Sequence, residues 1–328
     1  MNQPIIRVVD LAFVRYRTND LEGMERFLKA FGMTVNTRIG NTLYMRGTDS
    51  DQYIYTTELT KKPGFIGPSF EVESMTDLEK VSTSFENAGD IEKISGPGEG
   101  YSVAMLDPDG YEVQFVYGID KLPCLNTRDA LSFNTGTKKG RTGLFQRPTA
   151  GPAHVKRVGH LILRVADFDK SISFYQKFGF TLSDSVYDPK DDSQTLVAFM
   201  KCNRGAKWTD HHTLGLARRT PIAVDHTAFE CLDMDDVVLG GNYLKAQGYQ
   251  RAWGVGRHIL GSQIFDYWRD PHGFKIEHWT DGDLVNMESP VTRVPAGEDG
   301  PGAISQWGSI SEDYLKIYPE AVEIGPEK

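Results

Sequence analysis

The chain has 328 residues, of which 39% are hydrophobic, 25% charged and 11% aromatic. This mix is typical of a folded globular protein and excludes a wholly disordered or collagen-like chain. The formal net charge of −9 argues against nucleic acid as a partner. No apolar run approaches the roughly 20 residues of a membrane span, so we expect no membrane partner.

The length predicts about two domains. The N-terminal residues show no basic stretch followed by an apolar core, so we expect no signal peptide.

Three widely spaced cysteines, Cys124, Cys202 and Cys231, form no CxxC motif. This pattern is typical of a protein in the reducing cytoplasm.

The two halves of the chain repeat one pattern. Residues 8–16 and 157–165 are β-branched and apolar and predict a strand in each half. Each strand leads into an amphipathic helix, with apolar residues at i, i+3 and i+4. The expected helix boundaries are an N-cap aspartate and a terminal glycine: Asp20 and Gly32 in the first half, Asp167 and Gly179 in the second.

A second repeated unit follows in each half. Residues 66–89 and 224–248 predict a strand, a turn and a helix, and each leads through a glycine-rich stretch into a hairpin with a DP-x-G turn. We therefore expect an α+β protein of four βαβββ modules, two in each half. The expected divisions are an N-terminal domain over 1–120, a linker over 121–155, a catalytic domain over 156–283 and a tail over 284–328.

The eight histidines are distributed unevenly, and none precedes His154. When the repeats are aligned, Leu11, Gly67 and Gln114 correspond to His160, His226 and Glu277. A single histidine or glutamate in a strand is more often structural, but three coincident replacements predict a metal site. Two histidines and a carboxylate form the facial triad of non-haem Fe(II) oxygenases, and the same donors can hold zinc.

Further polar residues cluster with these strands. His212 lies at the start of the strand-like HHTLGLA, and His211 beside it should point to the opposite face because side chains alternate along a strand. His258 follows the glycine-rich stretch. Tyr267 should pair across the hairpin from Glu277, which places its hydroxyl beside the metal.

We expect the other histidines to be structural or solvated: His154, His272 and His278. Apolar candidates for a pocket wall are Val197, Phe199, Trp208, Trp253, Ile259 and Trp307. The apolar stretch at 303–318 of the tail could dock as a helix or cover a pocket.

The segment GRHILGSQIFDYWRDPHGFKIEHWTDGD, with HHTLGLA and VGHLILRV, resembles the type I extradiol ring-cleavage dioxygenases of the vicinal oxygen chelate superfamily. The resemblance covers roughly residues 8–283 and is strongest from residue 156. It implies two tandem glyoxalase-like domains with the metal site in the C-terminal one. It also implies a homo-oligomer that opens a catechol-type ring with O₂ in aromatic-compound degradation.

The resemblance also assigns roles to residues. It implies that Fe(II), or Mn(II) in its place, is held by His160, His226 and Glu277. The catalytic residues that it implies are His212 as acid and base, with His258 and Tyr267 near substrate and metal. The segment between His212 and His226 is shorter than in the family, so His211 and His212 both remain candidates for the acid–base role.

Two other functions fit the same scaffold. One is a glyoxalase-type isomerase or an epimerase that uses Zn, Ni or Co. The other is a metal-free small-molecule binding protein resembling the bleomycin-resistance proteins, which would give no reason for the three ligands.

Overall fold

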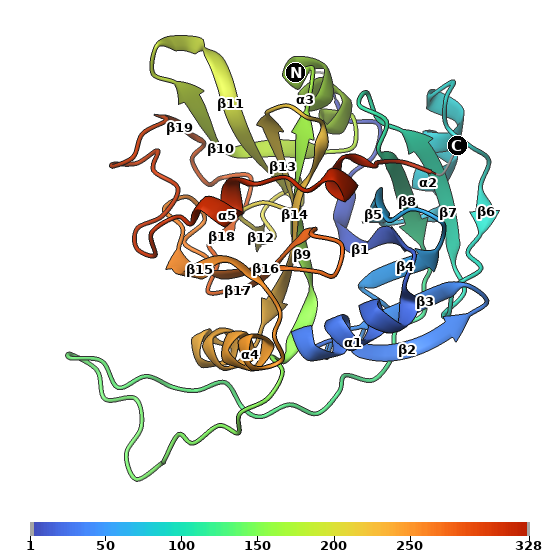
Figure 1. Ribbon diagram of the computed structural model, residues 1–328. Helices are drawn as coiled ribbons and strands as arrows, with labels where there is room; N and C mark the ends of the chain where they lie inside the picture. The colour runs from blue at the N-terminus through green and yellow to red at the C-terminus, as the bar shows by residue number, and fades with distance from the viewer. Residues whose placement is uncertain (1–2, 327–328) are drawn as a thin grey trace.

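Two β-sheets, one from each half of the chain, form the framework of the computed structural model, which describes residues 3–326 (Figure 1). The first half contains β1 (Val8–Thr18), α1 (Leu21–Phe31), β2 (Thr34–Ile39), β3 (Thr42–Arg46), β4 (Tyr55–Leu59), β5 (Gly64–Val72), α2 (Met75–Ser84), β6 (Glu92–Lys93), β7 (Tyr101–Leu106) and β8 (Glu112–Tyr117). No helix among residues 3–326 has both the length and the apolar character that a membrane crossing requires.

The second half repeats this order and adds a tail. It contains β9 (Val155–Val165), α3 (Phe168–Gln176), β10 (Phe180–Asp188), β11 (Asp191–Cys202), β12 (Thr209–Asp210), β13 (Leu214–Arg218), β14 (Ala223–Cys231), α4 (Met234–Ala246), β15 (Arg251–Arg257), β16 (Ile264–Arg269) and β17 (Lys275–Thr280). The tail contains β18 (Leu284–Val285), β19 (Thr292–Pro295), the short helix α5 (Glu312–Leu315) and the 3₁₀ turn η1 (Pro319–Val322).

The sheet orders show the repeated modules directly. The first sheet runs β2-β3-β4-β1-β5-β8-β7-β6, and the second runs β15-β16-β17-β14-β9-β13-β11-β10-β19. In each sheet the first strands of two βαβββ modules lie antiparallel at the centre, β1 beside β5 and β9 beside β14. The predicted α+β architecture is confirmed.

Local sequence signals set three of the four predicted helix ends. Asp20 caps α1 by accepting a hydrogen bond from the Gly23 amide at 2.8 Å, and Asp167 caps α3 in the same way. Gly32 ends α1 with a φ of 116°, in a region that L side chains avoid. Both helices therefore begin at the predicted aspartate, and α1 ends at the predicted glycine, whereas α3 ends at Gln176 with Lys177 as its C-cap, before the predicted Gly179.

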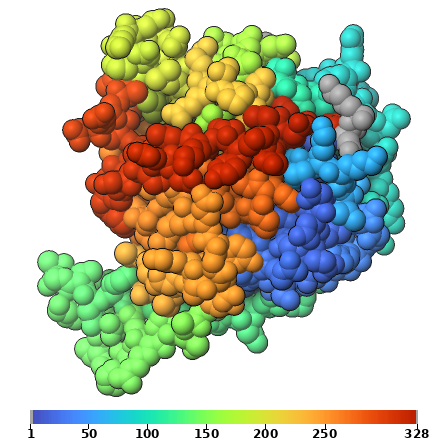
Figure 2. Space-filling view, viewed as in Figure 1, coloured from blue at the N-terminus to red at the C-terminus, as the bar shows by residue number. Residues whose placement is uncertain are grey.

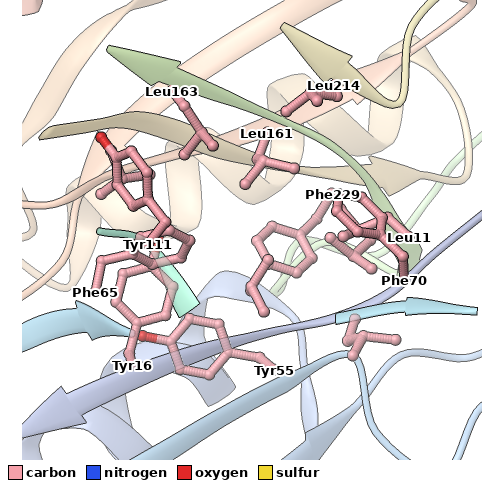
Figure 3. Close-up of a cluster of buried hydrophobic side chains, with 14 of the residues drawn as sticks. Leu11, Tyr16, Tyr55, Phe65, Phe70, Tyr111, Leu161, Leu163, Leu214 and Phe229 are labelled. Atoms are coloured by element: carbon pink, nitrogen blue, oxygen red, sulfur yellow. The ribbon is translucent and has the colours of Figure 1, made fainter. Parts of the chain in front are cut away.

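The two sheets share one hydrophobic core (Figure 3). Its side chains come from strands of both halves: Leu11, Tyr16, Tyr55, Phe65, Phe70, Tyr111, Leu161, Leu163, Leu214 and Phe229. Tyr16 from β1 packs its ring 5.1 Å from the Phe274 ring, and its hydroxyl lies 3.0 Å from the Thr227 hydroxyl in the other half. The structure thus joins the halves through packed apolar surface, which fixes the second sheet against the first.

The strand register corrects one pair of the repeat alignment. Ser69 on β5 pairs with Phe13, and the equivalent residue of β14, Ala228, pairs with His160. The counterpart of His160 is therefore Phe13, and the predicted counterpart Leu11 is wrong. The two alignments differ by two residues, a shift that leaves the alternation of side chains along a strand unchanged and so cannot be detected from the apolar pattern.

The linker and the tail lie outside this repeat. Much of the segment between β8 and β9 extends away from both sheets (Figure 1). The tail crosses the face of the second half and ends against the first half, where Ile324 forms a β-bridge with Phe65 of β5 (Figure 2).

Candidate metal centre

Three neighbouring strands bring two histidines and a glutamate together. Ala228 of β14 pairs with His160 of β9 on one side and with Glu277 of β17 on the other. His226 lies two residues before Ala228 and so points to the same face. The Nε2 atoms of His160 and His226 lie 3.2 Å and 3.3 Å from Oε2 of Glu277. One ligand atom from each of the three residues lies within 4.8 Å of the others.

The donor atoms fit a divalent cation. Glu277 is fully buried, and neither of its carboxylate oxygens has a hydrogen-bond partner among the described residues. A buried carboxylate without a partner is costly unless a cation compensates it. Two imidazoles and one carboxylate on one face suit Fe(II), Mn(II) or Zn(II) and leave coordination positions open.

The equivalent place in the first half offers no such donors. Gln114 is the counterpart of Glu277, and its amide oxygen accepts a hydrogen bond from the Ser69 hydroxyl at 2.9 Å. Gly67 is the counterpart of His226, and a Cβ there would overlap the carbonyl oxygen of Glu112. A side chain cannot be placed at that position without moving the backbone.

An aspartate beside the site orients His226. The Nδ1–H of His226 donates to Asp225 at 3.2 Å, which leaves Nε2 free toward Glu277. Asp225 also accepts from Lys275 at 2.8 Å and from Arg164 at 2.9 Å. Burial alone would raise the pKa of Asp225, but the nearby Lys275 and its other partners hold it well below the usual range. The sequence analysis missed Asp225, although its position directly before His226 was a usable signal.

Burial keeps the imidazoles of the site neutral. It lowers the pKa of His160 to about 3, and it also lowers the pKa of His226. Neutral imidazole is the form that binds a metal ion. Burial also raises the pKa of the Glu277 carboxyl, and a bound cation would offset this effect.

Tyr267 and His258 lie beside the three residues. Tyr267 pairs directly across from Glu277 in the β16–β17 hairpin, as the sequence predicts. Its hydroxyl lies 2.9 Å from Nε2 of His258. The Nδ1 of His258 lies 2.7 Å from the carbonyl oxygen of Ile304, so the tail fixes this ring with Nε2 toward the site.

His211 and His212 are adjacent in sequence but lie at different depths from the cavity. The ring of His212 lines the cavity, with its centre 4.2 Å from that of His160. The ring of His211 lies behind it, with Nδ1 3.0 Å from Nδ1 of His212 and Nε2 2.7 Å from a carboxylate oxygen of Asp184. Both histidines precede β13 and do not begin it. Of the two candidates for the acid–base role, we therefore favour His212, because it alone lines the cavity.

The three other histidines make structural contacts. His278 faces away from Glu277 and is buried, with its Nε2 2.6 Å from the Phe31 carbonyl oxygen and its ring stacked on Phe31. His272 contacts the Thr18 hydroxyl, and His154 contacts Asp236.

A cavity of about 750 Å³ opens in front of the site. Strands β9 to β13 give its inner wall, with Ile162, Val186, Leu196, Val197 and Phe199, and the tail gives its outer wall, with Ala303, Ile304, Trp307 and Ile310. Of the six apolar residues considered from the sequence, Val197, Phe199 and Trp307 line the cavity. Trp253 packs instead behind Tyr267, and Trp208 is 65% exposed outside the cavity. Residues 303–310 of the tail therefore cover a pocket, and the short helix α5 that follows docks with Tyr314 buried, so both alternatives left open for this stretch occur.

Comparison with known proteins places the site in a family. Residues 157–278 match the model of the Glyoxalase/Bleomycin resistance protein/Dioxygenase superfamily. This part of the chain is a domain of that superfamily. All three residues of the candidate metal centre lie within the matched range.

Two curated relatives extend the match over most of the chain. Metapyrocatechase 2 of Cupriavidus necator is 27% identical over 312 residues, covering 92% of this chain and 89% of the relative. The iron-dependent extradiol dioxygenase of Rhodococcus jostii is 25% identical and covers 91% of this chain and 95% of the relative. By name, these superfamily relatives are extradiol dioxygenases.

Solved structures share the two-domain fold. A Mn(II)-bound glyoxalase from Novosphingobium aromaticivorans has a TM-score of 0.77 at 19% identity and covers 97% of this chain and 98% of its own. Homoprotocatechuate 2,3-dioxygenase from Brevibacterium fuscum has a TM-score of 0.78 at 17% identity and covers 97% of this chain and 94% of its own. At these identities the likeness shows the fold alone.

Proposed function

We propose that this protein is an extradiol dioxygenase that uses Fe(II) and O₂ to cleave a catechol-type ring in the degradation of aromatic compounds. The observation that carries the proposal is the unpaired, buried carboxylate of Glu277 between two neutral imidazoles, facing a large cavity. The names of the curated relatives support the same reaction.

When bound, the metal would supply the electron transfer between a diol substrate and O₂. The other roles belong to the chain itself. His212 would take a proton from a substrate hydroxyl at Nε2, because its Nδ1 is occupied by His211. His258 and Tyr267 would hydrogen-bond the substrate oxygens, and the apolar inner wall would hold the ring and exclude water.

The Glu277→Gln variant tests the ligand assignment. Gln is nearly the same size but lacks the negative charge, so we expect loss of bound iron and of catechol-dependent O₂ uptake. Metal content is measured by mass spectrometry after anaerobic Fe(II) loading, and O₂ uptake is measured with an electrode. Glu71→Gln, the same change on the first-half sheet, is the control and should retain both bound iron and O₂ uptake. An iron-free Glu277→Gln protein with full O₂ uptake would refute the ligand assignment.

A glyoxalase-type isomerase is the second candidate. The same donor set suits other divalent metals, and one structural neighbour is a Mn(II)-bound glyoxalase. Consumption of one O₂ for each catechol would support the dioxygenase. Absence of uptake across a panel of catechols, with stoichiometric Fe(II) or Mn(II) bound, would favour the isomerase.

Three further proposals concern the whole protein and not its active site. We propose the domain division at residues 121–155, a homo-oligomeric assembly and a cytoplasmic location. The free state of Cys124, Cys202 and Cys231 supports a reducing compartment.

A further inference from the structure

Residues 128–149, here called the arm, project from the molecule beside α4 (Figures 1 and 2). Three large apolar side chains of the arm are exposed: Phe133 at 58%, Leu144 at 68% and Phe145 at 80%. Apolar groups gathered on a projection of this kind mark an interaction site, because a monomer gains nothing from leaving them in water.

The arm is an ordered element that bonds to itself. Asn134 and Arg141 exchange two hydrogen bonds of 2.9 Å between side chain and backbone. The Arg141 guanidinium also donates to the carbonyl oxygens of Ser132 and Leu144. Every hydrogen bond of residues 132–147 to the described chain stays within the arm. The arm therefore keeps a hairpin-like shape without support from its own body.

The base of the arm is fixed to the body. Both terminal nitrogens of Arg128 donate to the Asp233 carboxylate at 2.7 Å, and the Leu131 amide donates to the same group at 2.8 Å. Asp233 is also the N-cap of α4, so the exit direction of the arm is tied to this helix.

The charge of the arm is opposite to that of the chain. Residues 128–147 contain five Lys or Arg and one Asp, whereas the whole chain contains 45 acidic and 36 basic residues. Within the described residues, Lys138, Lys139 and Arg147 form no ion pair with a carboxylate. The arm thus offers unpaired cations next to exposed aromatic and aliphatic groups.

A complementary surface lies at the far edge of the first sheet. Glu86, Asp90 and Glu92 are exposed there, and Tyr101 and Leu106 of the adjoining β7 are 41% and 44% exposed. The amide of Asn87 donates to the Leu106 carbonyl oxygen, which keeps the acidic loop against β7. Figure 1 shows β6 and the arm on opposite sides of the molecule, so an arm cannot reach this edge of its own chain.

We propose that the arm docks on a second copy of this chain, at the acidic β6–β7 edge of that copy. The contact covers the apolar residues of the arm with Tyr101 and Leu106, and it pairs the arm cations with Glu86, Asp90 and Glu92. Because the two surfaces differ, the contact is head-to-tail. This inference does not depend on the reaction that the metal centre catalyses.

The mass of the full chain in solution tests the proposal. Light scattering after gel filtration should give a multiple of the 36.7 kDa chain mass for the unchanged protein. The Leu144→Ser/Phe145→Ser variant should approach the monomer mass, whereas Trp208→Ser, which removes an exposed side chain outside the arm, should not. Thermal unfolding of both variants in circular dichroism should match the unchanged protein, because the replaced side chains are exposed and the arm tip forms no hydrogen bond with the rest of the described chain. A monomeric unchanged protein at about 50 μM, or an intact assembly of the arm variant, would overturn the proposal.

Charge reversal tests the docking edge. Glu86→Lys/Glu92→Lys should weaken assembly at least about tenfold, and so should Lys138→Glu/Lys139→Glu. Mixing the two charge-reversed proteins should restore assembly between them. The basic edge of one variant then faces the acidic arm of the other, and its unchanged basic arm faces the unchanged acidic edge. Failure of the edge variant to dissociate would refute this edge, and binding of the arm to RNA or anionic vesicles by a monomer would refute a second copy as its partner.

Discussion

A chain of three hydrogen-bonded side chains, Asp184, His211 and His212, sets which ring nitrogen of His212 carries the proton. Asp184 accepts a hydrogen bond from the Nε2–H of His211, so Nδ1 of His211 carries no proton. This Nδ1 can therefore accept a hydrogen bond from a protonated nitrogen. That nitrogen is Nδ1 of His212, at 3.0 Å. The Nε2 of His212 then carries a free lone pair on the cavity side, as a general base requires.

Asp184→Asn should disturb this arrangement without touching the metal ligands. The amide of asparagine would donate to Nε2 of His211, which turns the proton of that ring toward His212 and leaves Nε2 of His212 protonated. We expect kcat for catechol cleavage to fall by about 10²–10⁴-fold, the range for loss of a general base. Steady-state O₂ uptake measures kcat, and mass spectrometry should show unchanged iron.

Asp188→Asn on the same strand is the matched control, because Asp188 bonds only to its neighbour Lys190 among the described residues. Nitrogen NMR of the imidazoles would report the proton position directly. An unchanged His212 tautomer in Asp184→Asn would refute this explanation even if kcat fell.

The two DP-x-G hairpins show how one element positions the site. The Asp270 carboxylate accepts the amides of His272 and Phe274, and Asp107 makes equivalent bonds in the first half. These bonds close the turn tightly, so the following strand starts in a fixed register. In the second hairpin that register places Tyr267 opposite Glu277.

Replacing the turn glycines by alanine should separate backbone strain from packing. Gly110 and Gly273 have φ values of 99° and 87°, and a Cβ in this region costs roughly 1–2 kcal/mol. A Cβ on Gly110 would meet nothing within 4 Å, whereas one on Gly273 would lie 2.6 Å from the Tyr318 ring. Gly273→Ala should therefore lower the free energy of unfolding more than Gly110→Ala in urea titrations. Equal losses would show that Tyr318 moves aside freely.

Strands and hairpins were the part of the structure that local sequence could predict. Alternating apolar residues and DP-x-G turns carry the register of β16 and β17, and this is why Tyr267 was placed correctly opposite Glu277. The alignment of His160 with Leu11 was wrong because a shift of two residues keeps the same alternation of side chains along the strand. Asp184 was missed because its link to His211 crosses 27 residues and depends on tertiary packing.

The tail was less predictable for a different reason. The segment in front of the cavity contacts the second half through its own backbone atoms: Trp253 donates to the carbonyl oxygens of Gly308 and Ser309, and Arg257 pairs with Trp307. Backbone contacts impose little pattern on the side chains that make them. The sequence therefore allowed a segment that covers the cavity, but it held no pattern that would separate this segment from the docked helix α5 that follows it.

At the scale of the whole molecule, the two halves are joined by packed side chains. Phe70 and Phe180 pack with ring centres 5.0 Å apart, and Tyr175 donates from its hydroxyl to Asp107 at 2.8 Å across the two sheets. Apolar surface shared in this way is exposed if either half unfolds alone.

We expect a single cooperative unfolding transition for the whole chain. A fragment of residues 152–328 should show weak near-ultraviolet circular dichroism and should bind a hydrophobic dye, because it lacks the first-half cover of its core. Calorimetry of the full chain and dichroism of the fragment are the measurements. Two separate calorimetric transitions, or a fragment with native-like near-ultraviolet signal, would show instead that the halves are independent domains.

The position of the tail bears on how this protein could acquire new substrates. Residues 303–310 face the cavity from outside, yet none belongs to the metal centre or to the His211–His212 pair. Their attachment through main-chain groups tolerates many side chains. Evolution or directed mutagenesis can therefore vary the substituents accepted on the ring by exchanging a short segment, while the reactive centre in the sheet is inherited unchanged.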